Sequence, residues 1–172
     1  SYSTTVCGCH IALKHIFPDV PVNGGTFKPV KFIIPEGSFL YAKPQHSVSG
    51  YLEVLGRILD VVFGALAQAI PEKVPAAPFG TIGVMTIGGY HPETEKYFVG
   101  VFPYPGGYGA TKESDGLING TPPQSLANFM SIESAEHRYP IMFECYKLRE
   151  GSGGSGYHRG GPGTSYTIRS LS

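Results

Sequence analysis

The chain has 172 residues, of which 41% are hydrophobic and 15% charged, so it has enough apolar side chains for a core and is not a charge-rich disordered segment. Thirteen basic and thirteen acidic side chains give a formal net charge of zero, which argues against nucleic acid or an anionic membrane surface as a partner. No apolar run reaches the ~18 residues that a membrane span needs, and three cysteines fit a reducing compartment, so we expect a cytoplasmic protein.

The first part of the chain contains one predicted helix, one turn and two predicted strands. Apolar residues recur at helical spacing over residues 5–17, which predicts a short helix that a proline ends. The segment Pro21-Val-Asn-Gly-Gly25 is typical of a turn. Residues 30–34 and 39–42 are apolar runs separated by Pro35-Glu-Gly-Ser38, and they predict two strands joined by a turn.

Residues 51–70 form the clearest element of the sequence. The polar side chains Glu53, Arg57, Asp60 and Gln68 fall on one narrow stripe of a helix, and most other positions are Leu, Ile, Val, Phe or Ala. We therefore expect one long helix that protein encloses on most sides. The polar stripe either lines a cleft or is a solvated edge whose charges pair with one another, and both interpretations stay open.

The second half of the chain predicts strands joined by glycine- and proline-rich turns. The predicted elements are a β-hairpin with strands at 81–90 and 96–104, a short helix at 126–138, a strand at 141–149, a glycine-rich turn region at 151–163 and a last strand at 165–169. Taken together, the elements predict a single α+β domain over residues 1–172, with a mixed or antiparallel sheet, one long buried helix and two short helices.

Three motifs have the residue types of chemical sites, and the sequence favours a structural alternative for each. Cys7-Gly-Cys9-His10 lacks the Cys-x-x-Cys spacing and the second ligand pair of a zinc site, which favours a packing role. Glu133 and His137 stand four residues apart, where a helix-stabilising pair outweighs a cation site. The loop Gly151-Ser-Gly-Gly-Ser-Gly156 with Arg159 can bind an anion through backbone N–H groups, although a plain glycine turn is favoured.

Short motifs along nearly the whole chain resemble, in the same order, those of the hydantoinase B/oxoprolinase family. These motifs are Pro21-Val-Asn-Gly-Gly25, Lys28-Pro29, Ile34-Pro-Glu-Gly-Ser38, Arg57-Ile-Leu-Asp60, Gly64-Ala-Leu-Ala-Gln68, Pro71-Glu-Lys-Val-Pro-Ala76, Asn128, Glu133, Glu136, Tyr139-Pro140, Leu148-Arg-Glu-Gly-Ser-Gly-Gly154 and Arg159-Gly-Gly161. Their common order makes the resemblance more specific than any one of them.

The resemblance implies the C-terminal part of a B-type subunit that works with an ATP-binding partner of the hydantoinase A type. In such a pair the partner phosphorylates a carbonyl or amide oxygen of a small molecule. The B-type subunit then completes the hydrolysis of a hydantoin, 5-oxoproline or lactam, and related subunits attach a carboxyl group to a ketone. The resemblance also implies that a divalent metal is bound outside this chain, in the remainder of the subunit, so that this chain alone is inactive.

Five residues are candidates for substrate binding: Asn23, Glu53, Arg57, Glu133 and Arg159. Asn23 can donate to a substrate carbonyl from its turn, and the carboxylates can orient a water molecule or a cation.

An alternative function follows from a departure within the motifs. At Gly50-Tyr-Leu-Glu-Val-Leu55 the family tends to have an asparagine and a serine where this chain has tyrosine and leucine. The loss of these polar groups favours either a more apolar substrate or a non-catalytic structural subunit of the same kind of complex. A third interpretation, a free-standing binding domain, requires the chain to be monomeric and to fold cooperatively by itself.

Overall fold

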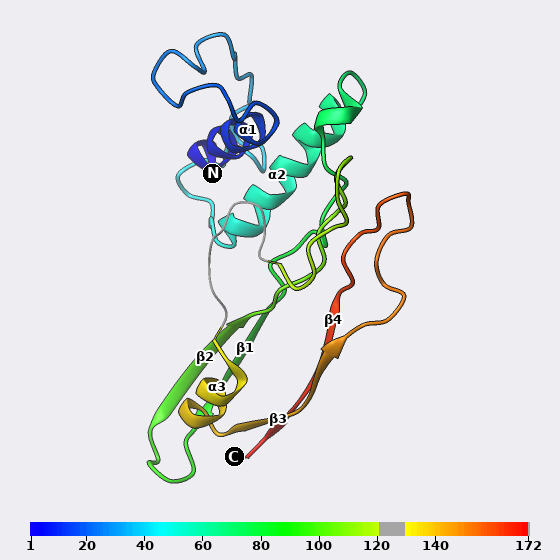
Figure 1. Cartoon of the computed structure of the whole chain (residues 1–172). Coiled ribbons are helices and arrows are strands. Elements are labelled where there is room, and N and C mark those ends of the chain that lie inside the picture. Colours follow the sequence, from blue (N-terminus) through cyan, green and yellow to red (C-terminus); the bar gives the residue numbers. More distant parts are fainter. Residues whose placement is uncertain (121–129, 172) are drawn as a thin grey trace. The chain divides into compact units, whose positions relative to one another are not determined.

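The structure, a computed structural model, describes residues 1–120 and 130–171 (Figure 1). The chain divides into two compact units, Ser1–Pro75 and Ala76–Ser172, and each is described by itself. Within the described residues there are three α-helices, one short 3₁₀ helix and two antiparallel sheets of two strands each. This architecture confirms the predicted α+β class. Among the described residues, no helix combines the length and the apolar character that crossing a membrane would require.

The first unit is built on two helices that pack against each other. Helix α1 (Tyr2–Ile16) and helix α2 (Tyr51–Leu66) confirm the two helices predicted for this half, and the 3₁₀ helix η1 (Pro71–Lys73) follows. Five apolar residues from the two helices form the buried core: Ala12, Ile16, Leu55, Leu59 and Phe63. The helices approach closely at Gly8, where an added Cβ would lie 2.8 Å from a methyl carbon of Ile58. A glycine there lets the two helix surfaces meet without an intervening side chain.

Within this chain, helix α2 buries one of its faces. Leu55, Ile58, Leu59 and Phe63 are buried, whereas the side chain of Val61 is 71% exposed. A single exposed apolar side chain is common on protein surfaces and does not by itself mark an interface. The expectation that protein encloses most of this helix therefore stays a prediction about the larger assembly.

The two strands predicted at residues 30–34 and 39–42 are wrong. These residues form turns and irregular backbone, and their hydrogen bonds are local or go to α1. The Gly37 N–H donates to the Tyr41 carbonyl at 2.7 Å, and the Thr5 hydroxyl of α1 donates to the Leu40 carbonyl at 2.8 Å. An apolar run becomes a strand only when another strand pairs with it. Here the run packs on a helix instead, with the Phe32 ring 5.4 Å from the His10 ring.

The second unit contains the two sheets. Strands β1 (Val84–Tyr90) and β2 (Tyr97–Pro103) form a hairpin in which Tyr90 pairs with Tyr97. Strands β3 (Ile141–Leu148) and β4 (Thr164–Ser170) form the second sheet, with a β-bulge between Phe143 and Cys145. These pairs confirm the predicted hairpin and the two predicted later strands.

Helix α3 (Ile132–Arg138) lies before β3 and belongs to the core of this unit. Its N-cap is Ser131, whose hydroxyl accepts a hydrogen bond from the Ser134 N–H at 3.2 Å. The helix confirms the predicted C-terminal end, whereas the predicted start at Leu126 and the motif residue Asn128 lie outside the described residues. The buried core consists of Phe102, Tyr104, Ala135 and Ile141.

Candidate functional site

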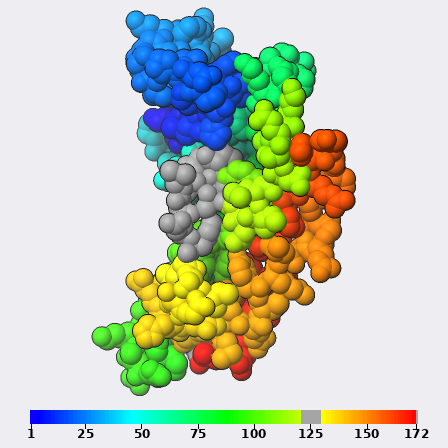
Figure 2. Space-filling view, in the orientation of Figure 1, coloured from blue at the N-terminus to red at the C-terminus, as the bar shows by residue number. Residues whose placement is uncertain are grey.

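A cavity of about 350 Å³ in the second unit lies among three segments that are distant in the sequence. Its walls come from residues 76–79, residues 107–110 and the loop 149–164. Figure 2 shows the surface of the segment around residue 110 lying beside that of the loop around residue 155. The loop is the glycine-rich region that the sequence predicted as a turn.

Glycine lets the backbones of these segments touch directly. A Cβ added to Gly107 would lie 1.8 Å from the carbonyl oxygen of Gly161, and one added to Gly116 would lie 2.0 Å from that of Tyr108. Backbone hydrogen bonds join the same segments, since the Gly161 N–H donates to the Tyr108 carbonyl at 2.8 Å. Any side chain at these positions would force the segments apart.

An Asp–His pair fastens the loop beside the cavity. One carboxylate oxygen of Asp115 accepts from the Arg159 N–H at 2.8 Å and lies 3.3 Å from Nδ1 of His158, a cavity-lining residue. The hydrogen bond from the Arg159 backbone, followed by the His158 ring, holds the pKa of Asp115 below its usual value. A carboxylate on Nδ1 favours the proton on that nitrogen, which leaves Nε2 of a neutral His158 as a proton acceptor.

Acid is expected to loosen this loop. Because the folded-state pKa of Asp115 is depressed, the loop contact contributes stability above the unfolded-state value near 3.8 and loses it as the pH falls through the lower folded-state pKa. We expect Asp115→Asn to speed hydrogen exchange at the Arg159 amide at neutral pH and to remove its acid dependence. The exposed Glu113 lies in the same segment, and Glu113→Gln serves as the control that leaves exchange unchanged. Equal exchange rates in both variants would contradict the role of Asp115.

The loop uses its backbone N–H groups within the protein. The N–H groups of Arg159 and Gly161 donate to Asp115 and Tyr108 in another segment, and those of Gly160 and Gly163 donate to Gly154 and Ser152 within the loop. These four groups are therefore not free to cradle an anion. The Arg159 side chain is exposed and does not line the cavity, whereas Arg149 and His158, which do, are not among the residues predicted from the sequence. Arg149 belongs to the motif Leu148-Arg-Glu-Gly-Ser-Gly-Gly154, and His158 directly precedes Arg159-Gly-Gly161. These glycine-rich motifs were the sequence signal that could have identified both residues.

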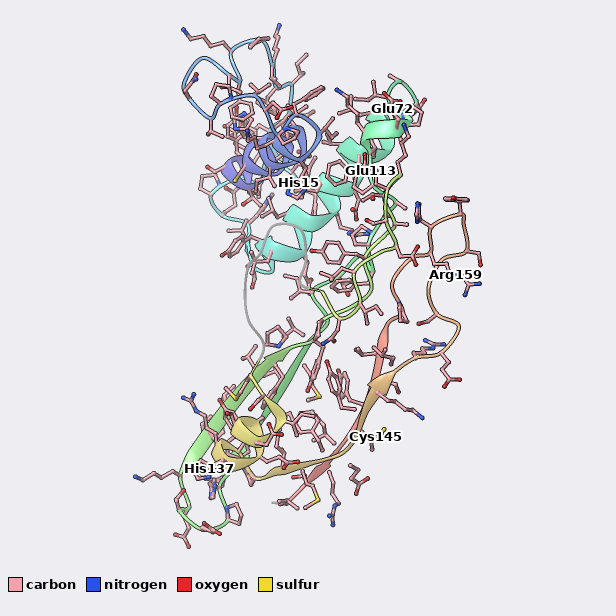
Figure 3. The ribbon with its side chains drawn as sticks, viewed as in Figure 1. His15, Glu72, Glu113, His137, Cys145 and Arg159 are labelled. Carbon is pink, nitrogen blue, oxygen red and sulfur yellow. The ribbon has the colours of Figure 1, made fainter. Side chains whose placement is uncertain are left out.

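Glu133 lies far from Arg159 within the second unit. Helix α3 with Glu133 in its first turn leads into one end of β3, and the loop with Arg159 follows the other end. Figure 3 shows His137 of α3 and Arg159 at opposite ends of this unit. The structure therefore does not bring these two candidate residues together.

The three candidates of the first unit have different local surroundings. The side-chain oxygen of Asn23 accepts from the N–H groups of Gly25, at 2.8 Å, and Thr26, at 3.2 Å, so it shapes its own turn. Glu53 is exposed in the first turn of α2. Arg57 forms an ion pair with Asp60 one turn further along the helix.

The ion pair places the Arg57 guanidinium beside the Asp60 carboxylate, which is largely buried. Asp60 keeps 14% of its side chain exposed, and burial raises its pKa, although the Arg57 charge and hydrogen bond act in the opposite direction. This geometry favours mutual pairing as the role of the polar stripe on α2. Any ligand that recruited Arg57 would have to compete with Asp60.

Neither Cys7-Gly-Cys9-His10 nor the pair of Glu133 and His137 forms a metal centre within the described ranges. Among residues 1–120 and 130–171, no three His, Cys, Asp or Glu side chains come together as a possible metal site. The His10 ring stacks on Phe27 with a centroid separation of 3.8 Å, which is a packing role. The described residues thus offer no cluster of three metal-binding side chains.

Three tyrosines form a second polar feature in this unit. The rings of Tyr104 and Tyr166 stack with a centroid separation of 3.8 Å, and the Tyr146 hydroxyl donates to Asn119 at 2.9 Å. Tyr104 is 8% exposed, and its hydroxyl has no hydrogen-bond partner among the described residues. No local pattern in the sequence predicts this cluster, because its members come from three separate segments.

Removing the Tyr104 hydroxyl is expected to stabilise the ligand-free protein. A buried hydroxyl without a partner costs about 1 kcal/mol or more, and Tyr104→Phe removes that cost while it keeps the stacked ring. Urea unfolding should therefore show an increase of about 1 kcal/mol in the free energy of unfolding. Tyr146→Phe, which breaks the bond to Asn119, should lower that free energy instead. A loss of stability in Tyr104→Phe would show that the hydroxyl has a partner.

The comparisons with known proteins confirm the family resemblance. The family model for hydantoinase B/oxoprolinase matches residues 1–172. The chain is 32% identical to 5-oxoprolinase 1 of Arabidopsis thaliana over 94% of this chain and 12% of that protein. It is 31% identical to caprolactamase subunit beta of Pseudomonas jessenii over 97% of this chain and 30% of that protein.

A solved structure shares the fold. The nucleotide-free structure of acetone carboxylase matches 94% of this chain and 22% of its own chain, with a TM-score of 0.71 and 21% sequence identity. The chain therefore spans less than a third of the length of each of these relatives. With a family model that matches from the first residue to the last, the chain belongs to the hydantoinase B/oxoprolinase family.

Proposed function

We propose that this chain is the C-terminal part of a B-type subunit in an ATP-dependent cyclic-amide hydrolase or a related ketone carboxylase. The family match over residues 1–172 carries this proposal. Relatives named 5-oxoprolinase and caprolactamase subunit beta point to a cyclic amide, and the acetone carboxylase structure extends the range to a ketone. The substrate classes are therefore hydantoins, 5-oxoproline, lactams and small ketones.

The chemistry explains why such a subunit needs a partner. A neutral amide is a poor electrophile, and phosphorylation of its oxygen turns that oxygen into a leaving group. In the proposed complex, an A-type partner subunit binds ATP and transfers the phosphoryl group to the carbonyl oxygen. The B-type subunit then acts on the phosphorylated intermediate.

A divalent metal does not fit the described residues of this chain, because they provide no cluster of three metal-binding side chains. In the glycine-rich loop, the N–H groups of Arg159, Gly160, Gly161 and Gly163 donate within the protein. We therefore assign ATP to the partner subunit and the metal to the remainder of the B-type subunit, and we route no step through either group here.

For the residues of this chain we propose contacts with the substrate or its intermediate. The candidates remain Asn23, Glu53, Arg57, Glu133 and Arg159. In the same loop as Arg159, the Nε2 atom of His158 can hydrogen-bond to a ligand, because Asp115 contacts the ring from its other nitrogen.

The test is ATP-dependent turnover in the complete assembly. We expect hydrolysis of 5-oxoproline, a hydantoin or a lactam, or carboxylation of a ketone, in step with ADP release. Alanine at a residue that contacts substrate should lower kcat/KM by about tenfold or more, without loss of stability. Unchanged turnover and unchanged stability in a variant would remove that residue from the site, and turnover that needs no ATP would contradict the proposed function.

A structural subunit is the second candidate. It is favoured by Asn23 and Arg57, because both side chains already form contacts within the protein. If all five alanine variants kept full turnover while removal of the whole B-type subunit abolished assembly, this candidate would replace the first.

A further inference from the structure

The hairpin of β1 and β2 has apolar side chains on both of its faces. On one face, Met85, Ile87 and Phe102 belong to the core of the second unit. The residues between them are exposed and form the opposite face, which we call the outer face of the hairpin. It consists of Val84, Thr86, Gly88 and Tyr90 of β1 and of Tyr97, Val99 and Val101 of β2.

The register of the two strands makes the outer face continuous. Directly opposite residues of an antiparallel pair present their side chains on the same face. Thr86 pairs with Val101, and Tyr90 pairs with Tyr97, whose ring centroid lies 5.6 Å from that of Tyr90. None of the seven residues is charged, and the charged residues of the hairpin lie in the connecting loop 91–96. Single exposed apolar residues are common on protein surfaces, whereas a continuous apolar face is not.

The sheet of β3 and β4 provides a comparison within the same unit. Its exposed residues include Glu144 and Arg169, which form an ion pair across the two strands at 3.0 Å. An antiparallel sheet with one face in water typically has apolar residues on the core face and polar residues on the other. The sheet of β3 and β4 has charges on its exposed side, and the outer face of the hairpin has none. This difference indicates that another protein surface covers the outer face.

The chemistry of the outer face favours a permanent contact. Permanent interfaces are more apolar than interfaces that form and dissociate, and charged residues are depleted at their centres. Relatives of this chain are much longer, since it matches 30% of caprolactamase subunit beta and 22% of the acetone carboxylase chain. Most of such a subunit lies outside the matched part and is covalently joined to it. That remainder is therefore the occupant that an uncharged, permanently covered face fits best.

We propose that the outer face of the β1–β2 hairpin packs against the remainder of the B-type subunit, through a surface that is likewise apolar and uncharged. The inference rests on the proposed function in one respect, that this chain is part of a longer B-type subunit. It requires no ATP, substrate or turnover, so it can be tested separately from the reaction. Val99 and Val101 supply aliphatic contacts, and the rings of Tyr90 and Tyr97 add large apolar areas.

The test is hydroxyl-radical footprinting of the full-length protein that contains this chain, with mass spectrometry of the Tyr97 peptide. Tyr97 is 67% exposed in this chain, so an uncovered Tyr97 should be oxidised nearly as fast as in the urea-unfolded protein. We expect oxidation several times slower in the native full-length protein, without ATP or partner subunit and at every protein concentration. Oxidation at the unfolded rate would overturn the proposal. Protection that disappears on dilution would assign the face to a second copy instead, and protection that needs the A-type subunit would assign it to that partner.

A charge on the outer face is the second test. Val101 is 60% exposed in this chain, so Val101→Lys leaves the core of the second unit intact but places an ammonium group in the proposed interface. It should raise the oxidation rate of Tyr97 toward the unfolded rate. The matched control is Thr167→Lys at an exposed position of β4, which should leave Tyr97 protected. A folded Val101→Lys protein with full protection of Tyr97 would overturn the proposal.

The two tests also separate this inference from the proposed function. The footprint of the parent protein needs no substitution, so it decides the question even if Val101→Lys does not fold. Protection of Tyr97 in a protein that shows no ATP-dependent turnover in the complete assembly would support the interface and contradict the proposed function alone.

Discussion

Alanine in place of Gly107 is expected to destabilise the second unit by about 3 kcal/mol or more. The added Cβ would lie 1.8 Å from the carbonyl oxygen of Gly161, and a backbone atom cannot swing away as a flexible side chain can. The clash would separate two segments that a hydrogen bond between Gly161 and Tyr108 joins. Urea unfolding followed by hydrogen exchange of peptides from residues 104–120 measures the effect.

The control for this variant lies in the glycine-rich loop that Gly107 contacts. A Cβ added to Gly154 would meet no atom within 4 Å, so Gly154→Ala should change stability by less than about 1 kcal/mol. Equal stability of the Gly107→Ala and Gly154→Ala variants would contradict the direct contact between the backbones of Gly107 and Gly161.

Leu59→Ala is expected to have the second large effect, in the first unit. Leu59 is fully buried between α1 and α2, and truncation of such a side chain removes apolar burial and leaves a cavity. We expect the free energy of unfolding to fall by about 2–5 kcal/mol. Urea unfolding of the protein, followed by hydrogen exchange of peptides from residues 1–75, measures this effect.

An exposed residue of the same helix is the control. Val61 is 71% exposed, so Val61→Ala should change the free energy of unfolding by about 0.5 kcal/mol or less in this chain. In the complete assembly, a larger cost at Val61 would indicate that protein covers this face of α2. Equal effects of the two substitutions in the isolated chain would contradict the described packing.

Elements with strong local patterns could be predicted from the sequence. The apolar spacing of α2 and the paired apolar runs of β1 and β2 were sufficient, because helix and hairpin contacts are local. The runs at 30–34 and 39–42 have the same composition as strands, but pairing partners are not encoded in a run itself. Their backbone groups form hydrogen bonds within the segment and with α1. The conformation of these runs is therefore decided by tertiary contacts.

The candidate sites were less predictable for the same reason. Glycine-rich motifs marked the loop at Arg159, yet the sequence alone did not reveal that the N–H groups of Arg159 and Gly161 donate to Asp115 and Tyr108 in a distant segment. Tyr104, Tyr146 and Tyr166 come from separate segments, and their cluster exists only after the strands pair. Patterns of residue type locate the chain segments, whereas long-range contacts decide which groups are left free.

The most direct measurement is substrate-dependent phosphate release by the purified A-type partner as the full-length B-type protein containing this chain is added. Phosphate release with a lactam, 5-oxoproline or hydantoin should rise with the B-type protein and saturate at a fixed ratio of the two subunits. Phosphate release that is independent of the B-type protein, or substrate turnover by the B-type protein without partner and ATP, would contradict a shared ATP-dependent reaction.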